Sequence, residues 1–384
     1  MHEPIGGEGS LRVALARGVV DPGLAQRLRI VAHLEGGAAS NLERLEKEAV
    51  SGQTLGEVLG LSRAAVHKHI DHLRSLGFVI ESVVGLGYRL AAPFTDLLAA
   101  EAVLPFLLPD LRKEQLWMAG LPYLYRQECD STNRVIRQVI KDEASPPGMV
   151  VVTDHQTHGR GRLDRVWRDQ VGKDLMFSLF LRPSIAPGQA HLLSLAAALA
   201  VAETVEAFVG LEETVSVKWP NDVMIGDRKA CGILLEGAMD GDRLRWVIVG
   251  VGLNVNSDPA VAAGVIARED HGSLGSRPWP VSLHAVLGSM VPRAPLLVAL
   301  LRRLTARCTD LEQPGGMSSV LESLAERDFL AGRHVEVFQG GDPQRAIVGE
   351  AAGIGAEGQL LVRLPSGGVT AVFAGDVNHT RQRR

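Results

Sequence analysis

The hydrophobic and polar positions near the N-terminus follow the spacing of helices. This spacing covers three stretches, residues 23–35, 41–50 and 54–61. Ser62 can cap a further helix, because a serine hydroxyl accepts hydrogen bonds from a first helical turn, and Gly77 provides a stop. After Gly77 the residues alternate like two short strands around a glycine turn. This order predicts a winged helix-turn-helix over 41–92, preceded by an N-terminal extension over 1–40.

Beyond Pro93, strands and helices mix without regular alternation. Apolar runs typical of strands occur at 149–153, 175–181, 231–237 and 244–255. Helical patterns occur at 131–143, 189–209 and 294–311. The order lacks the strict alternation of a doubly wound fold, so it predicts an α+β multidomain chain whose central domain, 93–328, holds a mixed sheet. Short strands with glycine-rich turns predict a small C-terminal β-barrel over 329–384.

Composition narrows the class of protein. A chain of 384 residues is long enough for two or three domains. Its net charge of −4 argues against coating nucleic acid or a membrane by bulk charge, so anion binding has to come from local clusters. Three scattered cysteines indicate neither a disulfide framework nor a structural zinc site. Without a signal peptide or a long membrane span in its sequence, the protein is expected to be cytoplasmic, with no membrane partner.

Residues 158–167, HGRGRLDRVW, place glycines beside arginines directly after a predicted strand. Arginine forks bind carboxylates and phosphates, and glycine lets the backbone approach a ligand. The stretch lacks the Gly-Lys-Ser/Thr of a phosphate-binding P-loop, and it lacks the third glycine of a dinucleotide fingerprint. A solvated basic loop is the plain alternative. Trp167 could stack on an adenine or belong to the core.

Four further stretches carry polar side chains where ligands often bind. DSTN at 130–133 opens a helix and has more polar groups than one N-cap needs. KWPND at 218–222 joins a lysine, an amide and a carboxylate, which suits phosphate and Mg²⁺. RKACGILLE at 228–236 and GVGLNVN at 250–256 place glycines inside strands, where a ligand can approach the backbone closely. Each stretch alone has a structural explanation as a cap, a turn or a strand.

Two other kinds of chemistry are disfavoured. His155 and His158 have a spacing that could bind zinc, but no third ligand accompanies them. No serine, cysteine or histidine stands in a recognisable nucleophile motif. The expected chemistry therefore needs no covalent enzyme intermediate.

Taken together, DSTN, GRGR…R.W, KWPND, RK..GIL.E and G.G.N.N resemble the motifs of biotin protein ligases, in the family's order and spacing. The resemblance runs from about residue 51 to the C-terminus. The segment SGQTLGEVLGLSRAAVHKHIDHLRSLG, followed by VVGLGYRL, is similar to the winged helix of the bifunctional type that also represses the biotin operon. The resemblance implies a class II synthetase or lipoate-ligase-like catalytic domain, followed by an SH3-like β-barrel.

The activity implied by the resemblance has two steps. Biotin and ATP give biotinyl-5′-AMP, and a lysine of the biotin carboxyl carrier protein of acetyl-CoA carboxylase then takes the biotinyl group. ATP and Mg²⁺ are the implied cofactors. The implied partners are the carrier protein, operator DNA and a second copy of the chain, which would bind when the adenylate is present.

The resemblance also assigns roles to individual residues. The implied biotin-binding residues are Ser131, Thr132, Asn133, Gln156, Arg160, Gly161, Arg162, Lys229 and Gly232. The implied ATP-binding residues are Arg165, Trp167, Lys218, Asn221, Asp222 and Asn254, of which Asp222 and Asn254 would also bind the metal. Arg162, Lys229 and Lys218 would be catalytic. Ser62, Arg63, His67 and Lys68 would contact DNA.

The chain departs from the family at two places. Asp164 stands where the family's loop usually has a glycine, and about 40 additional residues precede the winged helix. We expect Asp164 to weaken retention of the adenylate unless it pairs with Arg162, Arg165 or Arg168. Two alternative functions stay open, a biotin-sensing regulator without ligase activity and a lipoate-ligase-like acyl transferase.

Overall fold

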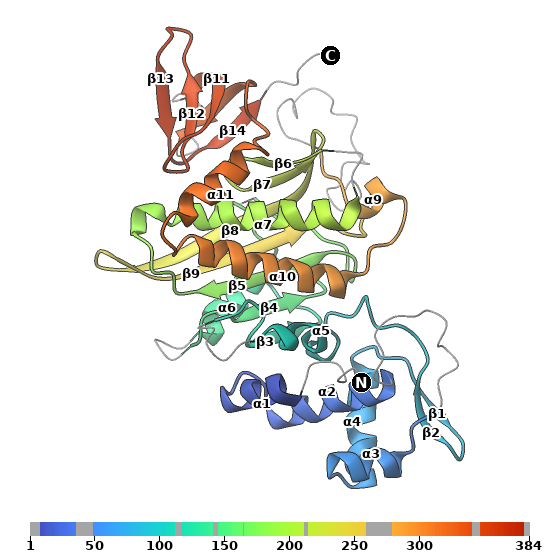
Figure 1. Ribbon diagram of the computed structural model, residues 1–384. Helices are drawn as coiled ribbons and strands as arrows, with labels where there is room; N and C mark the ends of the chain where they lie inside the picture. Colours follow the sequence, from blue (N-terminus) through green and yellow to red (C-terminus); the bar gives the residue numbers. More distant parts are fainter. Residues whose placement is uncertain are drawn as a thin grey trace.

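The computed structural model describes residues 8–35, 49–111, 117–140, 145–163, 165–210, 214–258, 279–339 and 346–379. These residues form a winged helix-turn-helix, a central mixed sheet covered by helices, and a C-terminal antiparallel sheet (Figure 1). The predicted α+β architecture of three parts is confirmed.

The N-terminal part contains four helices and a hairpin. They are α1 (Glu8–Ala16), α2 (Pro22–Glu35), α3 (Gly52–Leu59), α4 (Arg63–Ser75), β1 (Ile80–Val83) and β2 (Gly87–Leu90). Ser62 caps α4 as predicted, since its Oγ accepts from Ala65 N at 3.2 Å. Of the helix expected at 41–50, residues 41–48 lie outside the described residues, and Val50 forms a β-bridge with Tyr88 instead.

The helix α2 belongs to the hydrophobic core of the winged helix. Its Ile30, Val31 and Leu34 are buried in one cluster with residues of α3 and α4. Arg27 on α2 also forms a 2.5 Å ion pair with Glu101 of α5 (Ala100–Leu107). This helix, which the sequence analysis places in the N-terminal extension, therefore links the winged helix to the central part.

The central sheet has seven strands in the order β3-β4-β5-β9-β8-β7-β6. The strands are β3 (Tyr123–Arg126), β4 (Val150–Thr153), β5 (Leu175–Leu181), β6 (Val215–Lys218), β7 (Asp222–Ile225), β8 (Arg228–Asp240) and β9 (Arg243–Leu253). Only β3 and β4 are parallel, and the other neighbours are antiparallel. The mixed sheet predicted from the sequence is confirmed: the four predicted apolar runs correspond to β4, β5, β8 and β9, and the sheet also contains β3, β6 and β7.

Helices cover both faces of this sheet (Figure 1). α7 (His191–Val209), α10 (Arg293–Asp310) and α11 (Gly316–Ala325) pack on one side, and α6 (Thr132–Val139) packs on the other. The helix predicted at 131–143 ends earlier, at Val139. The stretch Pro187–Phe208 is long and apolar enough to cross a membrane, but 78% of its most apolar window is buried inside the protein. This burial is typical of a core helix.

The C-terminal sheet has five antiparallel strands in the order β13-β12-β11-β10-β14. They are β10 (His334–Phe338), β11 (Ala346–Ile354), β12 (Leu360–Arg363), β13 (Val369–Val372) and β14 (Asp376–His379). The indole of Trp219, 1% exposed, donates to Gly358 O at 3.0 Å. His191 of α7 bonds Glu357 O at 2.7 Å. These contacts hold the C-terminal sheet against the edge of the central sheet where KWPND turns.

Candidate functional site

A buried set of polar side chains surrounds the start of α6. Thr132 N donates to Gln156 Oε1 at 2.9 Å, so the structure brings together two of the predicted residues. Ser178 Oγ lies 2.6 Å from Thr132 Oγ1 and 2.5 Å from Asn133 Oδ1. Asn133 Nδ2 donates to Glu236 Oε2 at 2.9 Å. We call these five residues the α6 polar cluster. Ser178 and Glu236 were not predicted as site residues, although Glu236 ends the RK..GIL.E motif.

Ser131 stands at the N-cap position of α6, but its side chain makes no capping bond. Asp130 Oδ1 accepts from Ser131 N at 2.7 Å, and Asp130 also pairs with Arg134 at 2.6 Å. Ser131 itself is only 3% exposed. The Ser131 hydroxyl is therefore not used by the helix, which favours ligand binding over the capping explanation.

The described residues of the glycine–arginine stretch, 159–163 and 165–167, form a narrow loop, here named the Gly-Arg loop. Gly161 N donates to Arg165 O at 2.7 Å, and Trp167 N donates to Gly159 O at 3.0 Å. A Cβ on Gly159 would lie 2.4 Å from Trp167 O, so this position needs a glycine. Asp164, which is predicted to weaken retention of the adenylate unless it pairs with a nearby arginine, lies outside the described residues.

Each arginine of the Gly-Arg loop has a different partner. Arg160 pairs with Glu236 at 3.0 Å. Arg162 donates to Asn221 Oδ1 at 3.1 Å and to Gly375 O at 3.2 Å. Arg165 forms a bidentate ion pair with Asp376 of β14. Burial lowers the pKa of Arg162, although Asp376 and Asp222 favour its charged form. The loop is thus fastened to the KWPND turn and to the C-terminal sheet.

The ion pair between Arg165 and Asp376 leads to a first prediction. Burial favours the neutral carboxyl, but the bond and charge of Arg165 outweigh it and hold the Asp376 pKa below its ordinary value. Such a pair contributes its full stability above the ordinary aspartate pKa. This contribution is lost as the pH falls from there through the lowered pKa of the folded protein. Asp376→Asn should therefore speed hydrogen exchange of the Gly-Arg loop about fivefold, because a partly exposed pair contributes about 1 kcal/mol.

The measurement is hydrogen exchange by mass spectrometry at about pH 7, where the pair is fully charged. Glu350→Asn is the control, because Glu350 forms a more exposed 3.6 Å pair with Arg363 elsewhere on the C-terminal sheet. Equal exchange in the Asp376 variant and the native chain would show that the pair does not hold the loop.

Two lysines lie beside the loop. Lys229 Nζ is 2.7 Å from Asp222 Oδ1 and 5.9 Å from the ring centre of Trp167. Lys218 pairs in register with Asp222 across β6 and β7 and is only 6% exposed. Burial lowers the pKa of Lys218, and Asp222 offsets part of this effect. Lys229 therefore pairs with the Asp222 carboxylate, and Lys218 stands opposite Asp222 in the β6–β7 register, close enough for that charge to act on it.

The strand glycines of β8 and β9 make room for Trp167. A Cβ on Gly252 would lie 2.5 Å from Trp167 Cε2, and a Cβ on Gly232 would lie 3.1 Å from both Trp167 Cζ3 and Lys229 Nζ. The indole Nε1 is buried without a hydrogen-bond partner in the described part of the chain. The sequence predicted that a ligand approaches these glycines; in the structure the side chain of Trp167 lies against them.

The far end of β9 is tied to neighbouring segments. Asn254, 5% exposed, donates from Nδ2 to Val281 O at 3.2 Å. Lys229 N donates to Trp279 O at 2.7 Å. Trp279 is 41% exposed, which is unusual for a large aromatic side chain. It lies beside the candidate site, and it was not predicted from the sequence.

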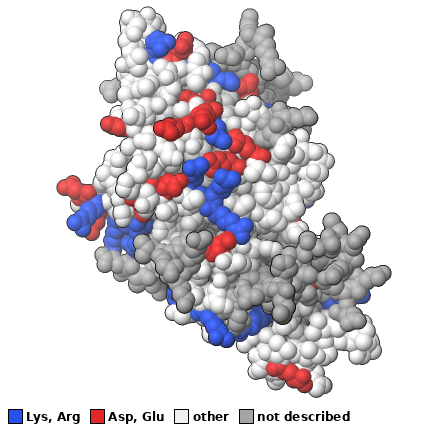
Figure 2. All heavy atoms as spheres, in the orientation of Figure 1, with Lys and Arg blue, Asp and Glu red and all other residues white. Residues whose placement is uncertain are grey.

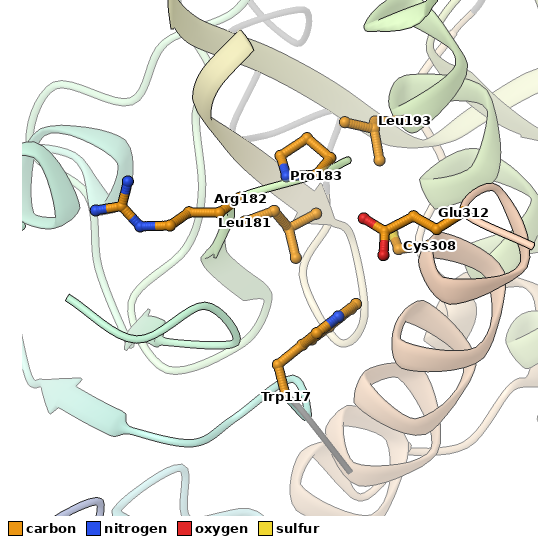
Figure 3. A pocket seen from close by; sticks show the side chains of 7 residues that line it. All are labelled: Trp117, Leu181, Arg182, Pro183, Leu193, Cys308 and Glu312. Carbon is orange, nitrogen blue, oxygen red and sulfur yellow. The ribbon is translucent and has the colours of Figure 1, made fainter. Parts of the chain in front are cut away.

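Zinc chemistry finds no support in the described residues. His155 bonds Asp169 at 2.9 Å and His158 bonds Thr157 at 2.9 Å. Among the described residues, no three His, Cys, Asp or Glu side chains gather as metal ligands. A separate hollow in Figure 3 is lined by none of the predicted site residues. It is formed by Trp117, Leu181, Arg182, Pro183, Leu193, Cys308 and Glu312.

The four predicted DNA-binding residues are all exposed at the start of α4 or along one side of it. Arg63 donates to Gln53 Oε1 at 2.6 Å, and His67 lies 3.2 Å from Tyr88 Oη of the wing. Elsewhere, acidic and basic side chains alternate over α7, α10 and α11 on the face shown in Figure 2, where Arg307 pairs with Glu203. This visible face therefore has no purely basic patch on those helices.

Comparison with known proteins agrees with this division of the chain. A model of the Biotin/lipoate A/B protein ligase family matches residues 123–254, and a model of an HTH domain matches residues 40–89. The chain is 33% identical over 312 residues to the bifunctional ligase/repressor BirA of Escherichia coli K12, which covers 81% of this chain and 87% of that protein. It is 40% identical over 212 residues to the protein of the same name from Bacillus subtilis 168, which covers 55% and 62%.

Solved structures show the same relationship for the central part. Biotin protein ligase from Aquifex aeolicus in complex with biotin and ATP aligns with a TM-score of 0.54 and 25% identity, covering 67% of this chain and 98% of that chain. The matches to two Bacillus relatives span 61% and 62% of the length of those proteins.

Fold and site together define a class, a helix-turn-helix domain joined to a mixed-sheet domain of the biotin and lipoate ligase type. The extent of the match to the E. coli protein makes the assignment more specific. The chain belongs to the biotin protein ligase family, in the bifunctional ligase/repressor branch with an N-terminal helix-turn-helix domain.

Proposed function

We propose that the chain is a biotin–[biotin carboxyl carrier protein] ligase that forms AMP and works in the cytoplasm. In the first step, the biotin carboxylate attacks the α-phosphorus of ATP, which gives biotinyl-5′-AMP and releases pyrophosphate. In the second step, a lysine amine of the carrier protein attacks the acyl carbon, and AMP leaves. The observation that carries this proposal is the ion pair of Lys229 with Asp222, opposite Lys218 on the neighbouring strand, on the same sheet that holds Ser178 and Glu236 of the α6 polar cluster.

Ser131 and the α6 polar cluster would hold the biotin head. Ser131 has a buried hydroxyl that its helix does not use, and Thr132 and Gln156 are already fixed by a mutual hydrogen bond. A preformed set of hydrogen-bonding groups suits the ureido ring of biotin, because little ordering is needed on binding. In this arrangement the biotin tail runs along Gly232 toward Lys229.

The cations would act on the reacting carboxylate and phosphate. Lys229 would approach the biotin carboxylate and the α-phosphate, and Arg162 would cover the adenylate with the Gly-Arg loop. Negative charge on the phosphate oxygens shifts during the displacement, so fixed cations lower the barrier without a nucleophilic side chain. A closed loop would also keep water from the acyl-adenylate.

The ATP side of the site would be formed by Arg165, Lys218, Asn221 and the two tryptophans Trp167 and Trp279. The donor set fits a Mg²⁺ ion arriving with the nucleotide, since Asp222 offers a carboxylate and Asn254 an amide oxygen. These two residues would hold it together with phosphate oxygens. When bound, the ion neutralises phosphate charge.

The test is detection of biotinyl-5′-AMP after incubation with biotin and ATP, by mass spectrometry of the acid-quenched protein. We expect the adenylate in stoichiometric amount, with lipoic acid giving far less. A regulator without ligase activity would bind biotin and form no adenylate, and a lipoate-type transferase would prefer lipoic acid. Either outcome would replace the present proposal.

The winged helix would make the protein a biotin-responsive repressor that binds operator DNA as a homodimer when the adenylate is present. Arg63 and Lys68 are exposed on α4, the helix that lies in the major groove in helix-turn-helix proteins. A dimer would supply two such helices, which a nearly neutral domain needs for specific affinity.

Lys68→Gln should weaken operator binding and reduce the salt dependence of the binding constant by about one ion per site, if Lys68 contacts a phosphate. Gel-shift titrations at several salt concentrations, with biotin and ATP present, measure this. Arg363→Gln on the C-terminal sheet is the matched charge control. An unchanged salt slope would remove Lys68 from the interface, and no binding by the native chain would remove the repressor function.

A further inference from the structure

Glu236, a member of the α6 polar cluster, also contacts the Gly-Arg loop, and its two carboxylate oxygens have different partners. Oε2 accepts from Asn133 Nδ2 at 2.9 Å. Oε1 accepts from Arg160 of the loop at 3.0 Å and from Arg137 of α6 at 2.6 Å. The Glu236 side chain is 14% exposed, whereas the two arginine side chains are 42% and 46% exposed. A single, mostly buried carboxylate on β8 thus binds one amide and two more exposed arginines.

The hydrogen atoms available in the α6 polar cluster determine which of its groups donate and which accept. Asn133 Oδ1 can only accept, so Ser178 must donate its one hydroxyl hydrogen to it. Ser178 Oγ also lies 2.6 Å from Thr132 Oγ1, and Gln156 Oε1 accepts from the Thr132 backbone N–H at 2.9 Å and from the Thr132 hydroxyl at 3.3 Å. The donors therefore run from Ser178 through Asn133 to Glu236. The Glu236 carboxylate can only accept, so the Asn133 NH2 group must face it, and this sets the orientation of the amide.

The backbone leaves space for this arrangement. A Cβ on Gly250 of β9 would lie 2.4 Å from Asn133 Oδ1, so the glycine is needed for the amide to reach both of its partners. Asn133 is 3% exposed and Ser178 is fully buried. Buried polar groups of this kind are costly to leave unpaired, which makes the arrangement sensitive to the loss of one member.

We propose that Glu236 is a positioning residue that makes the hold on the biotin head depend on the Gly-Arg loop being in place. Its two oxygens connect Asn133, at the wall of the head pocket, with Arg160, in the loop that covers the ligand. This inference rests on the proposed biotin site. It adds to that site an acidic residue that fixes the loop and the pocket in one arrangement.

Replacement of Glu236 by glutamine keeps the shape and an acceptor for Asn133 but removes the charge that holds Arg160. We expect biotin affinity, measured by calorimetry without ATP, to fall about tenfold, the effect of losing one charge-assisted contact. The KM for biotin should rise by a similar factor, with a much smaller change in kcat. A purely structural role would instead lower the melting temperature and leave the affinity unchanged, and this result would overturn the inference.

Two further variants keep the test decisive. Arg160→Gln, on the loop surface, should lose biotin affinity like Glu236→Gln, and the double variant should lose little more, because both remove the same contact. Additive losses would contradict the inference. An unchanged affinity of Arg160→Gln would contradict it too, and this result can be obtained even if Glu236→Gln does not fold. Glu350→Gln serves as the control for charge removal on a strand. Failure of the native chain to bind biotin would reject the proposed function itself.

Discussion

Replacing Lys229 by glutamine should slow adenylate formation about 100-fold to 1000-fold, the effect of removing one preorganised group that stabilises developing charge. Lys229 Nζ is held 2.7 Å from Asp222 and stands over the indole of Trp167. It also lies beside Gly232, where a Cβ would come within 3.1 Å of it. The ammonium is therefore held in place between Asp222, Gly232 and Trp167, where it would meet the carboxylate of biotin in the proposed site.

The measurement is the single-turnover rate of biotinyl-5′-AMP formation at saturating biotin and ATP. Lys173→Gln provides the control, because Lys173 is exposed and hydrogen-bonds through its backbone to Gln170 and Asn256. Lys229 is 29% exposed, so the glutamine variant should keep its fold. A rate for Lys229→Gln within about threefold of the native rate would exclude a catalytic role for this lysine.

Replacing Arg293 by methionine should lower the free energy of unfolding by about 3–5 kcal/mol, the usual effect of breaking a buried ion pair from one side. The Arg293 side chain is 4% exposed and pairs with Asp154 at 2.7 Å and Asp96 at 3.0 Å. It also donates to Asp174 O at 3.3 Å. Burial would lower the Arg293 pKa, but the two aspartates raise it, so the group stays charged at every relevant pH.

The position of Arg293 gives this loss a functional meaning. Asp96 follows the winged helix, and Asp154 stands two residues before Gln156 of the α6 polar cluster. Arg293 at the start of α10 therefore fastens the connection from the DNA-binding domain to the strand end that leads into the pocket. Urea unfolding measures the stability. Arg302→Met is the control, since the ion pair of Arg302 with Asp110 is exposed. A loss of less than about 1 kcal/mol in the free energy of unfolding of Arg293→Met would contradict the account.

Many of the helices and strands could be predicted from the local pattern of apolar and polar residues. The four long apolar runs became strands of the central sheet, and the helices at 189–209 and 294–311 were confirmed within two residues. These elements are long and strongly apolar, which is where periodicity is most informative. β7 was missed because it is short and directly follows the Pro220 turn, whose polar residues hide the strand.

Contacts between distant segments had no local signal. Arg165 meets Asp376 across 211 positions, and Arg160 meets Glu236 across 76. The sequence marks each residue as charged but does not say which charges meet. The same limit explains α2, whose helical spacing was evident while its packing against α3 and α4 was not.

Transfer of labelled biotin to the lysine of a biotin carrier domain tests the central claim most directly. The native chain should label the carrier when biotin, ATP and Mg²⁺ are all present, and omission of any one should abolish labelling. Lys229→Gln should fail in the same assay and recover when synthetic biotinyl-5′-AMP replaces biotin and ATP, because the lysine is needed chiefly to form the adenylate. Absence of labelling by the native chain with a competent carrier, while biotin still binds, would contradict the account.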